Sequence, residues 1–137
     1  MIAVDVNAIA YLWIPGEMTA CAELALAKDP VWVSPILWRS EFRNILAGYL
    51  RRKELSPSTV DRCLQGAHDH LSGREYILPS SLVMACVARS NCSAYDCEYV
   101  ALAEDLDIKL LTSDREVLRE FPDVAVSLRE WGSARAD

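Results

Sequence analysis

The chain begins MIAVDVNAIAYLW (residues 1–13), in which apolar residues stand on both sides of one carboxylate, Asp5. We interpret residues 2–6 as a buried strand and the residues that follow, to about residue 13, as a helix. An ionised carboxylate is rarely buried unless another group pairs with its charge. The stretch therefore predicts a strand that ends at a buried Asp5, whose charge must be paired with another group.

The length and composition predict one soluble globular domain over residues 1–137. The chain is 52% hydrophobic and 25% charged, and no apolar run approaches the roughly 20 residues that span a bilayer. The N-terminus lacks the basic stretch and apolar core of a signal peptide, so we expect a cytoplasmic protein. A net charge of −6 argues against broad attraction to nucleic acid, but a bound metal could reverse the sign at a nuclease site.

Strand-like and helix-like segments alternate along the chain. Ser-Pro pairs at 34–35 and 56–57 give the start signal of a helix, with Ser as N-cap and Pro at the first helical position. This alternation predicts a three-layer α/β/α sandwich around a mainly parallel sheet, in which sites form beyond the carboxyl ends of the strands. The predicted strands are 2–6, 31–34, 74–79, 108–114 and 124–128, and the predicted later helices are 18–28, 34–53, 56–71, 80–90, 93–105 and 114–121.

Two acidic residues fall at the ends of predicted strands. Asp5 ends the first strand, and Asp114 follows the run IKLLT. Because parallel strands end at the same edge of a sheet, both residues should open onto one side. Each also has a local explanation, since Asp5 could accept hydrogen bonds from nearby backbone and Asp114 could cap the helix that follows it.

Two further acidic residues lie on the inward stripes of predicted helices. Glu41 is three residues after Trp38 and four before Ile45, and Asp96 precedes Tyr99 by three. Their alternatives are a pairing of Glu41 with a buried arginine and a capping box of Asp96 with the serine three residues before it. Acids on apolar stripes point toward the interior.

Convergence of these four acids would require a cation. Buried carboxylates that share a site raise one another's pKa, and a hard divalent ion relieves this repulsion. Mg²⁺, or Mn²⁺ in its place, prefers carboxylate oxygens, waters and phosphate oxygens. None of the four positions carries a thiolate or an imidazole, which disfavours zinc. A carboxylate-held divalent ion suits hydrolysis of phosphodiester bonds by an activated water.

The four motifs VDVNAIAY, SEFRNIL, SAYDCEYVALAEDLD and LLTSD, in this order, resemble those of the PIN-domain nucleases, and above all the small VapC-type toxins of prokaryotic toxin–antitoxin pairs. The resemblance spans essentially the whole chain. It implies a PIN fold, Mg²⁺-dependent endoribonuclease activity on an RNA substrate, a homodimer, and a cognate antitoxin that covers the site. By motif position it implies Asp5, Glu41, Asp96 and Asp114 as the catalytic and metal-binding set, with Asp5 and Asp96 as the most direct ligands.

The same resemblance gives supporting residues. Asn7 matches a polar position just after the first acid, and it could equally cap the first helix. Thr112 and Ser113 are candidates for hydrogen bonds to the metal ligands or to substrate phosphate. Arg43, two residues from the second acid, is a candidate for a phosphate contact. Glu116 stands where some members of the family carry a further acid, and it could instead be a first-turn residue favoured by the helix dipole.

Two alternatives compete with a ribonuclease. The first is a PIN-like scaffold that binds RNA or protein without cutting, and retention of all four acids counts against it. The second is another Asp-based phosphoryl enzyme, either a receiver domain or a haloacid-dehalogenase-type phosphatase. The phosphatase pattern needs a second Asp two residues after the first, where this chain has Asn7. A receiver domain would place its acids near the end of its first strand.

Overall fold

A computed structural model of the protein describes residues 1–133 and contains a five-stranded sheet in which every neighbouring pair is parallel. The strand order is β3-β2-β1-β4-β5, so β1 and β4 lie side by side in the middle. The strands are β1 (Ile2–Val4), β2 (Trp32–Pro35), β3 (Glu75–Tyr76), β4 (Leu110–Thr112) and β5 (Ala125–Ser127). This architecture confirms the α/β fold with a parallel sheet that the alternation of segments predicts.

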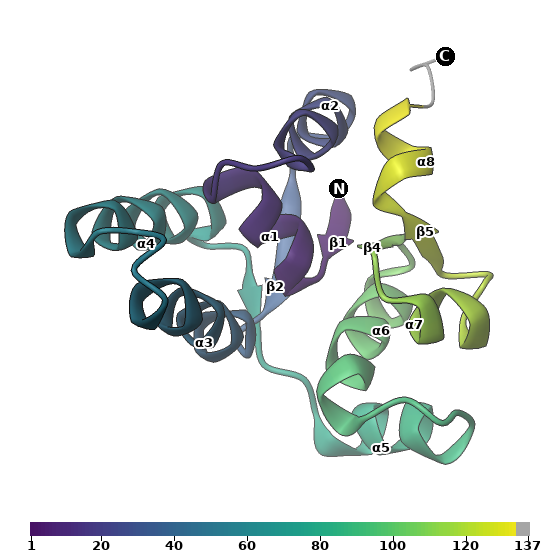
Figure 1. Ribbon diagram of the computed structural model, residues 1–137. Helices are drawn as coiled ribbons and strands as arrows, with labels where there is room; N and C mark the ends of the chain where they lie inside the picture. Colours follow the sequence, from purple (N-terminus) through teal and green to yellow (C-terminus); the bar gives the residue numbers. More distant parts are fainter. Residues whose placement is uncertain (134–137) are drawn as a thin grey trace.

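Helices cover both faces of the sheet, as Figure 1 shows. They are α1 (Val6–Trp13), α2 (Thr19–Lys28), α3 (Trp38–Arg51), α4 (Pro57–Leu71), α5 (Ser80–Ala88), α6 (Ala94–Leu106), α7 (Arg115–Glu120) and α8 (Leu128–Ser133). No helix among residues 1–133 is both long and apolar enough to cross a membrane. The predicted domain runs to residue 137, and residues 134–137 lie outside the described part of the chain.

Two hydrophobic cores form because successive strand residues point to opposite faces of the sheet. Ile2 and Val4 of β1 belong to the core beneath α1, α3 and α4, whereas Ala3 belongs to the core beneath α5, α6 and α7. Strands β1, β2 and β4 are buried on both faces, which is typical of a parallel sheet between two helical layers, whereas the edge strands β3 and β5 are partly exposed. The helices that carry the predicted acids Glu41 and Asp96, α3 and α6, thus approach the sheet from opposite sides.

The structure corrects one predicted element, the helix over residues 34–53. Ser34 and Pro35 belong to β2, and α3 begins only at Trp38. The Ser34 hydroxyl donates to the carbonyl oxygen of Val4 at 3.1 Å. By the register of the ladder, that oxygen faces the nitrogen of residue 35, and a proline has no N–H to donate. The hydroxyl supplies the missing donor, so the Ser-Pro pair completes a strand here.

The starts of α4 and α6 follow their local signals. Ser56 caps α4 by accepting from the N–H of Thr59 at 3.2 Å, and Ser93 caps α6 by accepting from the N–H of Asp96 at 3.1 Å. Strands β1, β3, β4 and β5 are shorter than predicted, and β2 has the predicted length but lies one residue further along the chain. Helix α8 is an element that the sequence analysis did not predict, and it follows β5 directly.

Candidate active site

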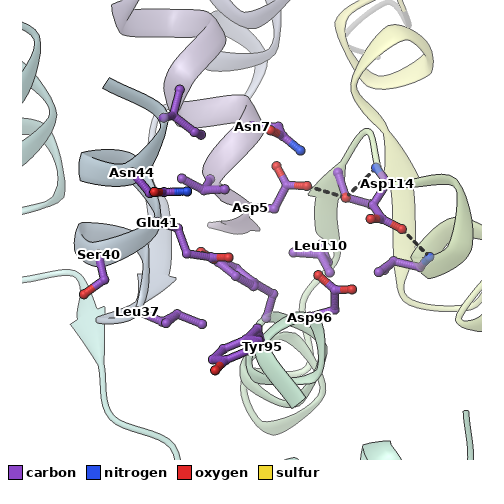
Figure 2. A pocket seen from close by; sticks show the side chains of 15 residues that line it. Asp5, Asn7, Leu37, Ser40, Glu41, Asn44, Tyr95, Asp96, Leu110 and Asp114 are labelled. Carbon is purple, nitrogen blue, oxygen red and sulfur yellow. Dashed lines mark hydrogen bonds between the residues drawn. The ribbon is translucent and has the colours of Figure 1, made fainter. Parts of the chain in front are cut away.

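The four predicted acids line one cavity of about 480 Å³ beyond the carboxyl ends of β1 and β4. Figure 2 shows Asp5, Glu41, Asp96 and Asp114 around the same space, each from a different part of the chain. Of the residues that the structure describes, the fifteen that line the cavity include no Lys, Arg or His. The negative charge of the lining is therefore not balanced by a cationic side chain of the lining.

Asp5 lies between β1 and α1 and is the N-cap residue of α1. One carboxylate oxygen accepts from the backbone N–H of Ala8 at 3.0 Å, and the other accepts from the hydroxyl of Thr112. The Asp5 residue is 8% exposed. Burial raises the pKa of Asp5 to about 6, although these hydrogen bonds to the carboxylate act in the opposite direction. Backbone and hydroxyl donors thus stabilise the charge of Asp5 only in part, because the pKa of the carboxylate stays raised.

Thr112 connects the two acids at the strand ends. Its hydroxyl donates to Asp5 and accepts from the backbone N–H of Asp114 at 3.0 Å, and the residue is 1% exposed. Asp114 also caps α7, because its carboxylate accepts from the N–H of Val117 at 2.9 Å. The alternative of a helix cap is therefore correct for Asp114, and the same carboxylate group still lines the cavity. Figure 2 draws these hydrogen bonds as dashed lines.

Glu41 comes to the cavity from the first turn of α3. The buried phenol of Tyr99, on α6, donates to Glu41 Oε1 at 2.6 Å. Its hydrogen-bond partner is thus a tyrosine, and the arginine that the alternative reading suggested is not its partner. Burial raises the pKa of Glu41, and the charge of Asp96 raises it further.

Asp96 occupies the first turn of α6, on the other side of the cavity. Burial raises its pKa first, and the negative charge of Asp114 raises it further. Asp96 therefore interacts electrostatically with acids from both α3 and the end of β4. The carboxylates repel one another, which is the condition that favours a bound cation.

The donor set fits a hard divalent ion. Every acid that lines the cavity offers carboxylate oxygen, and the neighbouring polar side chains offer amide and hydroxyl oxygen. Within the described part of the chain, however, no three His, Cys, Asp or Glu side chains are arranged to hold an ion together. Mg²⁺ usually keeps several waters and takes only one or two carboxylates directly, so this arrangement suits an ion that contacts some acids through water.

The supporting residues take different places. Asn7 and Thr112 line the cavity, whereas Arg43 and Ser113 are not among its lining residues. The backbone N–H of Ser113 bonds the Asp5 carboxylate and lowers its pKa. Arg43 is exposed and donates to the Ser40 hydroxyl at 3.2 Å. Its predicted phosphate contact stays a prediction.

Four lining residues with polar groups are absent from the site residues that the sequence predicts: Ser40, Asn44, Tyr95 and Tyr99. Their spacing holds a signal, because Asn44 follows Glu41 by three and Tyr99 follows Asp96 by three. Residues three apart share a helix face, so each should point the same way as its acid. The spacing places Tyr99 on the apolar stripe, but it does not reveal the hydrogen bond of Tyr99 to another helix.

The fold and the cavity define a PIN-like α/β domain with an acidic site at the carboxyl edge of its sheet. A scan against models of protein families finds no match. The chain is 31% identical over 124 residues to Ribonuclease VapC3 of Pyrobaculum aerophilum, a match that covers 88% of this chain and 95% of that ribonuclease. The chain therefore belongs to the VapC-type ribonucleases, a family of PIN-domain toxins.

A solved structure supports the fold independently. The crystal structure of PAE2754 from Pyrobaculum aerophilum matches this chain with a TM-score of 0.74 and 20% sequence identity. The match covers 96% of this chain and 92% of that chain. At this identity the likeness shows a shared fold, and it confirms the arrangement of helices around a parallel sheet.

Proposed function

We propose that this protein is a Mg²⁺-dependent endoribonuclease and the toxin of a toxin–antitoxin pair. The observation that carries the proposal is the cavity in which four carboxylates meet without a cationic side chain among the described lining residues. Membership of the VapC-type ribonucleases supports RNA as the substrate. Mn²⁺ could replace Mg²⁺, because both are hard ions that carboxylates and waters bind.

Asp5 and Asp96 would hold the ion most directly, with Glu41 and Asp114 completing its surroundings. When bound, the divalent ion supplies positive charge for the phosphate and lowers the pKa of a water nucleophile. Thr112 fixes the carboxylate of Asp5 through its hydroxyl.

Tyr99 holds one oxygen of Glu41, which leaves the other oxygen free to orient a water. Asn7 and Asn44 line the same cavity. Among residues 1–133, neither amide side chain makes a hydrogen bond, so both are available to substrate.

A protein partner is part of the proposal. Two exposed apolar side chains lie at or beside the cavity, with Met84 55% and Tyr95 63% exposed. Met84 and Tyr95 line a neighbouring hollow, and Tyr95 also lines the acidic cavity. A cognate antitoxin that contacts these side chains would cover the site. We also infer a homodimer from the family, and sedimentation of the purified protein would measure its oligomeric state.

Cleavage of RNA by the purified protein is the test. Mg²⁺ or Mn²⁺ should support cleavage, EDTA should stop it, and Asp5→Asn or Asp96→Asn should abolish it. Asp61→Asn, which changes an exposed carboxylate on α4, is the matched control and should cut like the wild type. Unchanged cleavage in both site variants would overturn the proposal.

The alternative is a PIN-like scaffold that binds RNA or protein without cutting. Calorimetry separates it from the proposed nuclease, because a scaffold without a metal site would show no heat of Mg²⁺ binding. The toxin role has its own test in the neighbouring gene: a short reading frame that encodes a DNA-binding protein would support it.

A further inference from the structure

A second cavity adjoins the acidic one and shares two of its lining residues. It has a volume of about 360 Å³ and lies between α1, residues 14–19 and α3. Asn7 and Ile45 line both cavities. Tyr11 and Tyr49 contribute partly buried aromatic rings to the second one. The two cavities are therefore adjacent, and a ligand bound at the carboxylates could extend past Asn7 and Ile45 towards these aromatic rings.

Helix α3 connects the two cavities along one face. Glu41, Ile45 and Tyr49 follow one another at intervals of four residues, which places them on the same side of the helix. The separation of eight residues between Glu41 and Tyr49 corresponds to about 12 Å along the axis. One or two nucleotides of an extended RNA strand cover such a distance.

The end of α3 adds positive charge next to Tyr49. The guanidinium carbon of Arg52 lies over the Tyr49 ring, 5.0 Å from its centroid. Arg52 is not among the residues lining the cavity, so it supports the ring from outside that space. Arg51, Arg52 and Lys53 are all exposed. Glu17 lines the second cavity and Arg52 forms an ion pair with Glu54 at 3.0 Å. Arg51 and Lys53 are therefore the cations that can contact the phosphates of a strand that passes Tyr49.

We propose that the second cavity binds a nucleobase of the RNA substrate, one or two positions from the phosphate that is cut, by stacking on Tyr49 and Tyr11. This inference rests on the proposed function and adds a base subsite to it. Aromatic rings are the usual platforms for the unstacked bases of single-stranded RNA. In the described part of the chain neither phenol oxygen makes a hydrogen bond, and the Asn7 amide stands at the junction. The Asn7 amide is free to bond the edge of the base, while the two rings stack on its faces.

A double-mutant cycle between protein and RNA tests the subsite. We use a short single-stranded RNA that the wild type cuts, and replace each base near the cut in turn by an abasic ribonucleotide. When the base that stacks in the subsite is the one removed, kcat/KM of the wild type should fall about tenfold. The fall should come from a higher KM, because a base–aromatic stack is lost. Tyr49→Leu should lose the same factor on intact RNA and almost nothing more on the RNA that is abasic at that position.

The controls separate stacking from folding. Tyr49→Phe keeps the ring and should restore sensitivity to the missing base. Leu50→Ala changes a neighbouring side chain that is 40% exposed, and it should behave like the wild type with every RNA. Tyr11→Leu should repeat the result of Tyr49→Leu at the same position. If the losses of Tyr49→Leu and of base removal multiply at every position, Tyr49 does not contact a base and the inference is wrong.

Failure of the proposed function gives a different result. A wild type that cuts no RNA with Mg²⁺ or Mn²⁺ contradicts the nuclease proposal, and the cycle is then measured on dissociation constants. The probe is short single-stranded RNA with 2-aminopurine at successive positions, whose fluorescence falls on stacking. Quenching at one position that Tyr49→Leu abolishes would support the base subsite in a non-cutting protein. Equal quenching by wild type and variant would overturn it.

Discussion

Replacing Asp5 by asparagine should stabilise the metal-free protein. Asp5 is 8% exposed, and burial raises its pKa from 3.8 to about 6. Because one pKa unit corresponds to about 1.4 kcal/mol, ionisation of Asp5 costs the folded state about 3 kcal/mol relative to the unfolded chain. Asparagine retains an oxygen that can cap α1, and it carries no charge to desolvate. Asp5→Asn should therefore raise the free energy of unfolding by at most about 3 kcal/mol. This value is an upper limit because the amide has one acceptor oxygen, whereas the carboxylate has two.

The sign of the pH dependence follows from the direction of the shift. The folded state binds the Asp5 proton more tightly than the unfolded chain does. Protonated Asp5 thus contributes its full stability below pH 3.8, and this contribution is lost as the pH rises through about 6. Asp5→Asn should exceed the wild type in free energy of unfolding above pH 7, and the difference should shrink towards zero near pH 3.8.

Urea unfolding followed by circular dichroism measures this difference, with EDTA present to keep divalent ions away. Asp61→Asn, on the exposed side of α4, is the control and should change the free energy of unfolding by less than about 0.5 kcal/mol. Added Mg²⁺ should narrow the gap, because an ion that binds the folded wild type stabilises it. A variant no more stable than the wild type above pH 7, or a difference that is constant with pH, would refute the reasoning.

Three further predictions concern the supports of the site and the fold. Thr112→Val should lower cleavage by about 10- to 100-fold in a steady-state assay, because the buried hydroxyl that bridges two acids is lost. Asp107→Gly should raise the free energy of unfolding in urea by about 1 kcal/mol, because Asp107 ends α6 with a positive φ of 53°. Asp105→Gly, within the helix, should lower this free energy by about the same amount. Leu46→Ala should cost about 2–5 kcal/mol of stability, and Leu50→Ala, at the exposed end of the same helix, far less.

The meeting of the four acids in one cavity was predictable because its signals lie in regular elements. Asp5 and Asp114 follow the ends of two parallel strands that are neighbours in the sheet, and Glu41 and Asp96 stand in the first turns of two helices. Burial and mutual repulsion raise the pKa of both helical acids, as the sequence analysis expects of convergent carboxylates. The second cavity was not predictable, because its walls come from separate helices.

The sequence by itself determined the elements whose signals act over three or four residues. Ser56 and Ser93 cap helices because a side-chain oxygen reaches an N–H three residues on, whatever the rest of the chain does. Only the tertiary structure decided that the Ser-Pro pair at 34–35 ends a strand, that Thr112 bonds Asp5 across 107 residues, and that Tyr99 bonds Glu41 across 58. Such bonds depend on which strands become neighbours, and burial of apolar faces sets that pairing for the chain as a whole.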